Sequence, residues 1–517
     1  MDMRFAGNKS KIPKLYEQLV GKRSPFLSRA ENYSRFTLPY LMADVNDDLS
    51  SQNAWQDDGA SATNFLSNKL SQVLFPAQRS FFRIDLTPEG IKQLDNEAMT
   101  QSTAQKLLSD VEKAAMLYGE SLQFRPAVVE AFKHLIVTGN VMMYHPDKTS
   151  PIQAVPLHHY CVRRDNNGTV LDIVFLQEKA LETFEPSIRM AIQASRKGKQ
   201  YKDKDNVKLY THAKRTKDGK YLIRQSADDV PVGKESTVTE DKSPFLILTW
   251  KRSYGEDYGR GMAEDHAGAF FVIQFLSEAL ARGMALMADV KYLVKPGSYT
   301  DINQFVEGGS GAVLHGVEGD IHIVQLGKYA DYTPIQAVLN DYRQRIGRVF
   351  MMEAMTRRDA ERVTAYEIQR DAMLVEQSLG GVYSLFATTF QGPLARWFMN
   401  GISSILTSKN VSPTILTGIE ALGRMAELDK LGTFNGYVSM TAQWPEPLQQ
   451  AIKWPDFTDW VQGQISANFP FFKTQDELNA EAQAQQEQEA TKYAAEQAGK
   501  AIPDMVKNGQ INPQGGQ

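Results

Sequence analysis

The chain has 517 residues, of which 42% are hydrophobic and 23% charged, a composition typical of a globular protein with room for about three domains. Its formal net charge of −4 excludes the overall basic surface of a nonspecific duplex binder, so any DNA contact must be local. The single cysteine, Cys161, excludes an intramolecular disulfide framework and is expected to be a small buried side chain.

Apolar residues recur at helical spacing in three segments of the first 140 residues. One segment ends at Pro76, one spans about residues 96–118, and one runs from Pro126 to Thr138. No apolar stretch near the N-terminus matches a secretory signal. We expect the apolar face of the second helix to comprise Leu107, Leu108, Val111, Ala115 and Leu117.

Residues 151–250 change to a period of two, which predicts a block rich in β-strands. Asn167-Gly168 and Asp218-Gly219 are expected to be turns between strands. The polar and charged run 195–206 is expected to be an exposed loop. His158 and His159, as neighbours on a strand, should point to opposite faces and so should not share a metal ion.

The segment 261–289 predicts a helix roughly 40 Å long with apolar residues on two sides. Phe271 and Phe275 lie nearly opposite the main stripe, so both sides of this helix must be covered. Polar and charged residues within the segment argue against a membrane span. The main stripe consists of Ala269, Ile273, Leu276, Leu280, Met284 and Met287.

A second long helix is expected to begin at Thr333-Pro334. Between the two helices lie seven glycines from Gly297 to Gly327 and an alternating strand at residues 321–326, which together predict a small β-module. Thr364 opens a third helix through a capping box, and its stripe reaches Phe386 and Phe390. Gly380 and Gly381 fall inside this helix and are expected to bend it.

The sequence lacks the usual signatures of catalysis and of metal or cofactor binding. It has no HExxH or GxSxG motif, and the glycine-rich stretch at Gly308 lacks the Lys-Ser/Thr of a phosphate loop. Paired acids such as Asp47-Asp48 are interpreted as solvated surface. We therefore predict no catalytic residue, no cofactor and no metal site, and a protein that is not an enzyme.

Six segments resemble, in the same order along the chain, the portal or head-to-tail connector proteins of short-tailed bacteriophages of the podovirus type. The run at Glu361–Phe386 carries the resemblance most clearly. The six segments are SRAENYSRFTLPYLM, NFLSNKLSQVLFPAQRSFFRIDL, AFKHLIVTGNVMMY, SYGEDYGRGMAEDHAG, ERVTAYEIQRDAMLVEQSLGGVYSL and PTILTGIEALGRMAELDKL.

This resemblance implies an α+β, mainly helical portal fold that assembles as a ring. Its regions would be an N-terminal helical and β-rich wing region (1–260), a stem helix (261–289), a clip β-module (290–332), a second stem helix (333–350), a tunnel loop (351–362), a long kinked wing helix with its extension (363–411), a crown (412–473) and a polar, partly disordered tail (474–517).

The resemblance also implies a homododecamer at one capsid vertex of the virion, assembled in the host cytoplasm and without a membrane partner. The ring would conduct double-stranded viral DNA, independently of its sequence, during packaging and ejection. Its other partners would be the terminase large subunit, tail adaptor and tail proteins, scaffolding and major capsid proteins, and internal core proteins at the crown.

By position, residues 351–362 match the loop that narrows such channels, and we expect Arg357, Arg358 and Arg362 to touch DNA phosphates. The alternative is that these arginines pair with Glu353, Asp359 or Glu361. The expected docking surface on the clip consists of Tyr299, Asn303, Gln304 and His315.

Two other functions are weighed against the portal. One is a different ring-forming virion component, a tail adaptor or tube protein, although such adaptors are usually much shorter. The other is a nucleic-acid enzyme of packaging, which would need a phosphate loop or a carboxylate cluster that the sequence lacks.

Overall fold

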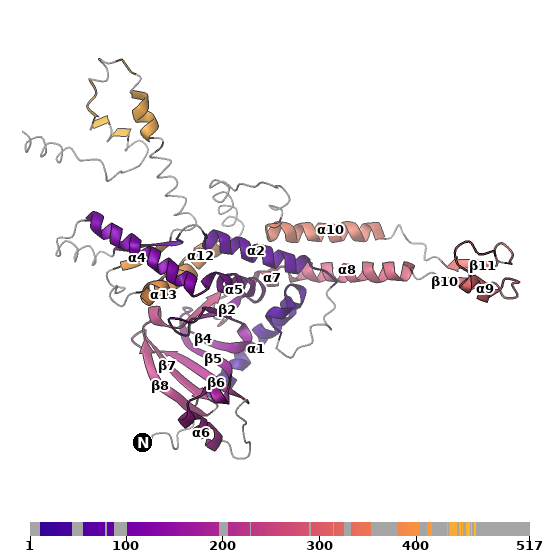
Figure 1. The fold of residues 1–517 in the computed structure, drawn as a ribbon, viewed down its shortest axis with the longest axis horizontal. Coiled ribbons are helices and arrows are strands. Elements are labelled where there is room, and N and C mark those ends of the chain that lie inside the picture. The colour runs from indigo at the N-terminus through magenta and orange to yellow at the C-terminus, as the bar shows by residue number, and fades with distance from the viewer. Residues whose placement is uncertain are drawn as a thin grey trace, which may run out of the picture. The chain divides into compact units, whose positions relative to one another are not determined.

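We describe the chain from a computed structural model, shown in Figure 1. It describes residues 11–43, 55–77, 80–86, 101–195, 205–227, 229–288, 291–313, 315–324, 332–352, 381–402 and 411–415, together with short stretches between 432 and 461. The chain divides into two compact units, Met1–Ile419 and Glu420–Gln517.

The described residues up to Thr138 include four α-helices. The last of them ends where Gly139 adopts a positive φ of 75° and donates its N–H to the carbonyls of His134 and Leu135, an ending that favours glycine. Three of these helices match the predicted segments. The four are α1 (Ile12–Phe36), α2 (Asp58–Leu74), α4 (Gln101–Ser121) and α5 (Phe124–Thr138).

The predicted apolar face of α4 is partly wrong. Ala115 is buried, but Leu107 and Leu117 are 49% and 73% exposed. Leu108, Val111 and Ala115 share one face at spacings of three and four, and Leu108 and Val111 pack against the core there. Leu117 falls about 200° around the helix from Ala115, on the side away from the core.

The predicted β-rich block contains two antiparallel sheets. A three-stranded sheet has the order β3-β2-β9, and a five-stranded meander has the order β4-β5-β6-β7-β8. The strands are β2 (Asn140–Tyr144), β3 (Gln153–Val155), β9 (Phe245–Thr249), β4 (Tyr160–Arg164), β5 (Val170–Ala180), β6 (Asn206–Arg215), β7 (Tyr221–Ala227) and β8 (Val230–Val238).

Both predicted turns are confirmed. Gly168 and Gly219 have φ values of 90° and 75° between β4 and β5 and between β6 and β7, a conformation that favours glycine. Cys161 is fully buried, as expected. Most of the predicted loop 195–206 lies outside the described residues, between α6 (Pro186–Ser195) and β6.

The expectation for the two neighbouring histidines is wrong. His158 and His159 end the 3₁₀ turn η3 (Leu157–His159), and their ring centroids are 4.0 Å apart. A strand would separate successive side chains by half a turn, whereas a 3₁₀ turn separates them by about 120° and lets the rings meet.

Arg23 fastens α1 to the edge of the β-rich block. Its side chain is buried, and Nη1 donates to the carbonyl oxygens of Leu157, His158 and Tyr160 at 3.2, 2.7 and 2.9 Å. These acceptors lie in η3 and at the start of β4. One guanidinium nitrogen therefore donates to three backbone oxygens that α1 covers.

Replacing Arg23 with alanine is expected to lower the free energy of unfolding by about 2–4 kcal/mol, because buried acceptors lose their donor. Urea denaturation of the full chain measures the change. Lys22→Ala is the matched control, since Lys22 is the exposed neighbour on the same helix, and its effect should stay within about 0.5 kcal/mol. Equal effects of the two substitutions would contradict this role of Arg23.

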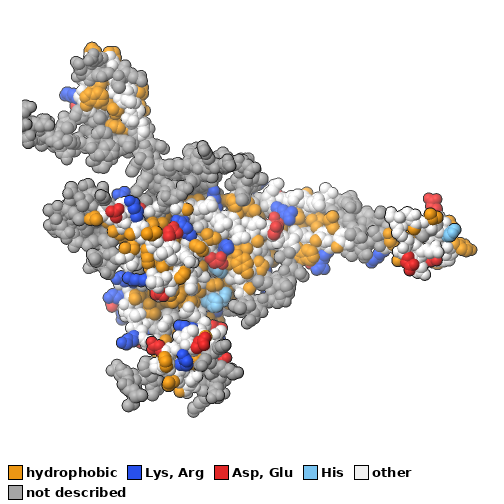
Figure 2. Space-filling model, viewed as in Figure 1, with side chains coloured by type: hydrophobic (Ala, Val, Ile, Leu, Met, Phe, Trp, Pro, Cys, Tyr) orange, Lys and Arg blue, Asp and Glu red, His pale blue; other side chains and the backbone are white. Residues whose placement is uncertain are grey.

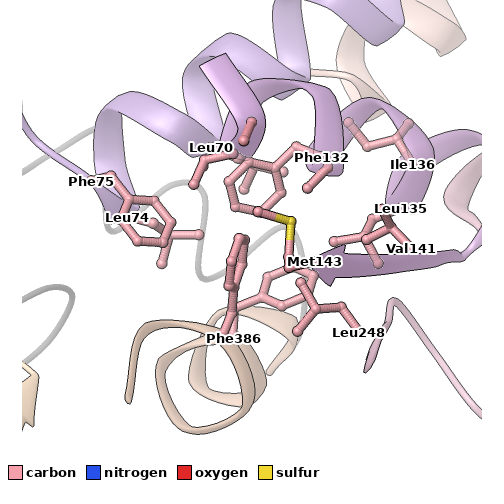
Figure 3. Packing of buried hydrophobic residues seen from close by; sticks show 14 of the residues in the cluster. Leu70, Leu74, Phe75, Phe132, Leu135, Ile136, Val141, Met143, Leu248 and Phe386 are labelled. Carbon is pink, nitrogen blue, oxygen red and sulfur yellow. The ribbon is translucent and has the colours of Figure 1, made fainter. Parts of the chain in front are cut away.

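An aromatic cluster forms the centre of the main core and joins distant parts of the chain. The ring centroid of Phe132 on α5 lies 5.6 Å from that of Phe386 and 5.7 Å from that of Phe390. Figure 3 shows Phe386 pointing towards Phe132 and Met143. The later segment consists of α12 (Val382–Phe386), the π-helical turn η8 (Ala387–Gln391) and α13 (Gly392–Ile402).

Two further features complete the described fold. In the first unit, β1 (Phe82–Leu86) pairs antiparallel with β12 (Val411–Ile415), across more than three hundred residues of sequence. In the second unit, residues 434–441 are helical, and a small core forms around buried Phe434 and Val461.

Candidate assembly surface and channel segment

The two predicted long helices are confirmed and pack against each other. They are α8 (Ala267–Ala288), preceded by the short α7 (Met262–Asp265), and α10 (Tyr332–Val349). The ring of Phe270, near the start of α8, lies 5.7 Å from that of Phe350, just after α10, so the helices run antiparallel (Figure 1). Between them Ile273 and Ile346 are buried.

The other side of α8 is apolar, as the sequence predicts, and is only partly covered by the described residues: the ring of Phe36 on α1 meets that of Phe271 edge-on at a centroid distance of 6.4 Å. Phe271 and Phe275 are 58% and 59% exposed and stack with a centroid distance of 6.4 Å. Met284, which the sequence places on the main stripe, is 55% exposed in the single chain, so that stripe is only partly buried. Hydrophobic side chains are visible along this pair of helices in Figure 2. We call Phe271 and Phe275 the stem patch.

A residue that sequence reasoning missed, Trp55, lies beside this patch. Its backbone N–H donates to Oε1 of Gln274 on α8 at 3.2 Å, and the guanidinium of Arg282 lies 5.9 Å from its ring centroid. The contact joins residues more than two hundred positions apart, so no local pattern could have revealed it. Phe270, by contrast, precedes Ile273 by three positions and could have been assigned to the buried stripe.

Three arginines of these two helices are paired with carboxylates. Arg343 contacts Asp58 at 2.9 Å, Arg345 contacts Asp341 at 2.6 Å, and Arg282 contacts Glu278 at 2.7 Å. Each of these arginines thus has a carboxylate within hydrogen-bond distance. Such pairing lowers the net positive charge that the helices present to a polyanion.

The predicted β-module follows α8. Strands β10 (Lys291–Val294) and β11 (Ile321–Val324) pair antiparallel, and α9 (Ile302–Glu307) lies between them in sequence. The Asp301 side chain caps α9 by accepting the backbone N–H groups of Asn303 and Gln304. None of the described residues 291–313 and 315–322 is buried.

All four residues expected at the docking surface are exposed. Asn303 and Gln304 lie together in the first turn of α9, whereas Tyr299 and His315 lie in separate loops, with Tyr299 91% exposed. The module also exposes apolar side chains. These are Tyr292, Leu293, Ile302, Val306, Val313 and Val317, between 49% and 98% exposed.

The predicted tunnel loop is described only at Met351 and Met352. Arg357, Arg358 and Arg362 lie outside the described residues, as do Gly380 and most of the helix expected from Thr364. Gly381 is described, has a positive φ of 88°, and is followed by α12 at Val382. The contacts of the three arginines and the bend remain predictions.

The described residues contain no group of three or more His, Cys, Asp or Glu side chains that could hold a metal ion. Among them, no helix combines the length and hydropathy needed to cross a membrane.

The chain is similar to known phage proteins over nearly its whole length. The family model described as bacteriophage head to tail connecting protein matches residues 9–471. A protein named portal protein in Enterobacteria phage SP6 is 58% identical over 507 residues, 98% of each chain. The portal protein of Escherichia phage T7 is 33% identical over 81% of this chain and 80% of its own.

The portal protein of Pseudomonas phage phiKMV is 31% identical over 91% of this chain and 93% of its own. A solved chain from the neck of an empty GTA particle covers 80% of this chain and 90% of its own, with 10% identity and a TM-score of 0.36, which is too low to carry an argument. On the family match and these sequence identities, the chain belongs to the bacteriophage head-to-tail connecting protein family, the family of the podovirus portal proteins.

Proposed function

We propose that the chain forms a ring of twelve copies at one vertex of a phage capsid, through which double-stranded DNA enters during packaging and leaves during ejection. The 58% identity to a protein named portal protein, over 98% of both chains, is the observation that carries this proposal. Size-exclusion chromatography with light scattering should give twelve times the 58.0 kDa chain mass. A monomer at every concentration would contradict it.

The stem patch supports a ring. Two stacked phenylalanines that are more than half exposed form a contiguous apolar surface of the kind that marks a protein contact. The buried stripe of α8 already packs on α10 within the chain. A neighbouring copy that covers Phe271 and Phe275 with a different part of its surface would make a heterologous, head-to-tail contact. Repeating that contact from copy to copy closes a ring when the rotation between copies divides a full turn evenly.

The β-module supports the same proposal independently. A segment whose described residues, 291–313 and 315–322, include no buried side chain cannot offset its own conformational entropy by hydrophobic burial. Its exposed apolar residues therefore need cover from another chain. In the ring, this clip would contact neighbouring copies, dock the terminase large subunit during packaging, and later dock the tail adaptor and tail proteins, with Tyr299, Asn303, Gln304 and His315 on its surface.

The remaining partners follow from the same assignment. Scaffolding and major capsid proteins would contact the ring where it sits in the capsid vertex, and internal core proteins would contact residues 412–473. The protein would assemble in the host cytoplasm and remain in the virion. These assignments rest on family membership, because the described contacts lie within one chain.

The tunnel arginines give a direct test of the channel. Replacing Arg357, Arg358 and Arg362 together with alanine is expected to lower the DNA retained in capsids by about tenfold, because phosphate contacts at the constriction are lost. Nuclease-protected DNA per particle measures the effect, and electron microscopy checks that rings form. The triple lysine variant keeps the charge and should retain most packaging. Normal packaging by the alanine variant would show that these residues do not make the proposed contacts with DNA in the channel.

Two alternative functions make different predictions. A tail adaptor or tube protein would join mature particles only after packaging, so its loss would still yield DNA-filled capsids, whereas loss of a portal prevents packaging. A packaging nuclease or motor would hydrolyse DNA or ATP with a divalent metal ion. We expect the purified protein to hydrolyse neither DNA nor ATP. Hydrolysis that disappears when one specific acidic residue is mutated would contradict a purely structural role.

A further inference from the structure

A cavity of about 760 Å³ lies in the first unit between the five-stranded sheet and the segment formed by η8 and α13. Its volume falls within the range of small-molecule sites. Arg164 at the end of β4, Arg215 at the end of β6 and Arg396 on α13 all line it. Three guanidinium groups from three separate elements therefore converge on one space.

Two of these arginines have carboxylate partners in the cavity wall. Nη2 of Arg215 lies 3.1 Å from Oε2 of Glu240, and Nη1 of Arg396 lies 3.1 Å from Oδ1 of Asp241. These pairs hold the two guanidinium groups in place. Their remaining N–H groups can still donate to a ligand, because a guanidinium carries five donors.

Arg164 is bound differently. Nε donates to the backbone carbonyl of Asp257 at 3.0 Å, and Nη1 donates to the carbonyl of Gly168 at 2.8 Å. Within the described part of the chain, no carboxylate oxygen lies within 4.0 Å of its guanidinium, and Nη2 makes no hydrogen bond. The nearest carboxylate is that of Asp257, whose Oδ1 accepts the backbone N–H of Arg164 at 2.6 Å, so the Arg164 guanidinium has carbonyl oxygens as its direct partners and a carboxylate close by.

A second arginine adds positive charge beside Arg164. The guanidinium of Arg252 packs so closely on Gly168 that a Cβ built there would lie 1.9 Å from Nη2, and its hydrogen bond goes to the carbonyl of Glu256 at 3.3 Å. Burial and the neighbouring Arg252 lower the pKa of Arg164 below its ordinary value. The turn at Gly168 therefore lies between two guanidinium groups, and the carboxylates near it, those of Asp257 and Asp165, accept backbone N–H groups.

We propose that this cavity binds a small oxyanion of the phosphate class, with Arg164 as its main ligand and Arg396 and Arg215 as supporting donors. A partly buried guanidinium without a carboxylate in direct contact is costly, and an oxyanion bound to it lowers that cost. The planar fork of arginine matches the oxygens of a phosphate. A bound anion would join the five-stranded sheet to α13 and so stiffen the packing around residues 388–397.

Isothermal titration calorimetry of the full chain with inorganic phosphate tests the proposal, with chloride at equal ionic strength as the blank. We expect a dissociation constant of about 1 mM or tighter, and a thermal midpoint that rises with phosphate concentration. Adenosine monophosphate forms a second arm. Tighter binding of this nucleotide would assign a nucleotide phosphate, and equal binding would assign the free ion.

Arg164→Gln should weaken phosphate binding at least about tenfold. The matched control is Arg224→Gln, because Arg224 lies in the same sheet on β7, pairs with Glu235 at 2.8 Å and does not line the cavity. Arg396→Gln provides a second, independent loss if Arg164→Gln does not fold. Phosphate binding that is absent, or unchanged in both cavity variants, would overturn the site.

Discussion

Replacing Phe271 and Phe275 together with aspartate is expected to leave the chain folded but unable to form rings. The two rings are 58% and 59% exposed in the single chain, so little of the chain's own core depends on them. Covering their exposed parts should contribute about 1–1.5 kcal/mol each, and two buried carboxylates would add a desolvation cost. We expect the subunit dissociation constant to rise by roughly a hundredfold or more.

Light scattering across a concentration series measures this change. Met190→Asp is the matched control, since Met190 is an apolar side chain 68% exposed on α6, away from the stem patch. The control should form rings like the unmodified chain. Circular dichroism should show unchanged folding of the double variant. Rings of normal stability in that variant would show that the stem patch is not part of the subunit interface.

The Phe386→Ala substitution is expected to lower the free energy of unfolding by about 3–5 kcal/mol. Phe386 is fully buried, and its ring centroid lies 5.6 Å from those of Phe132 and Trp250. Its loss would leave a cavity where the later helices meet α5 and β9. Urea denaturation of the full chain, with the slope checked for constancy, measures the change.

Leu385→Ala is the matched control for that substitution, since Leu385 is the adjacent residue on α12 and is 39% exposed. Its effect should stay below about 1 kcal/mol. The difference between the two variants tests whether the end of the run 361–386 is anchored in the core. Similar small effects of both substitutions on the free energy of unfolding would show that Phe386 does not anchor this segment in the core.

Local patterns predicted the elements that depend on nearby residues. The two long helices follow from apolar spacing, and the turns at Gly168 and Gly219 follow from glycines that can adopt a positive φ. The exposure of Phe271 and Phe275 also followed from their place on α8. These features need only the periodicity of one element.

Features that depend on distant parts of the chain could not be predicted. The pairing of β1 with β12 and the contact of Trp55 with Gln274 join segments without a shared local signal. The cavity at Arg164 is a further example, because its arginines come from three separate elements. Leu117 is a different case: the prediction placed it on the apolar face of α4, but its angular position, about 200° from Ala115, places it outside.

Electron microscopy of the purified full-length protein in negative stain tests the central claim most directly. The account predicts rings of twelve subunits with a central hole, and their loss when Phe271 and Phe275 are replaced with aspartate. Particles without a ring or without a central hole, at concentrations where the chain is fully folded, would contradict it.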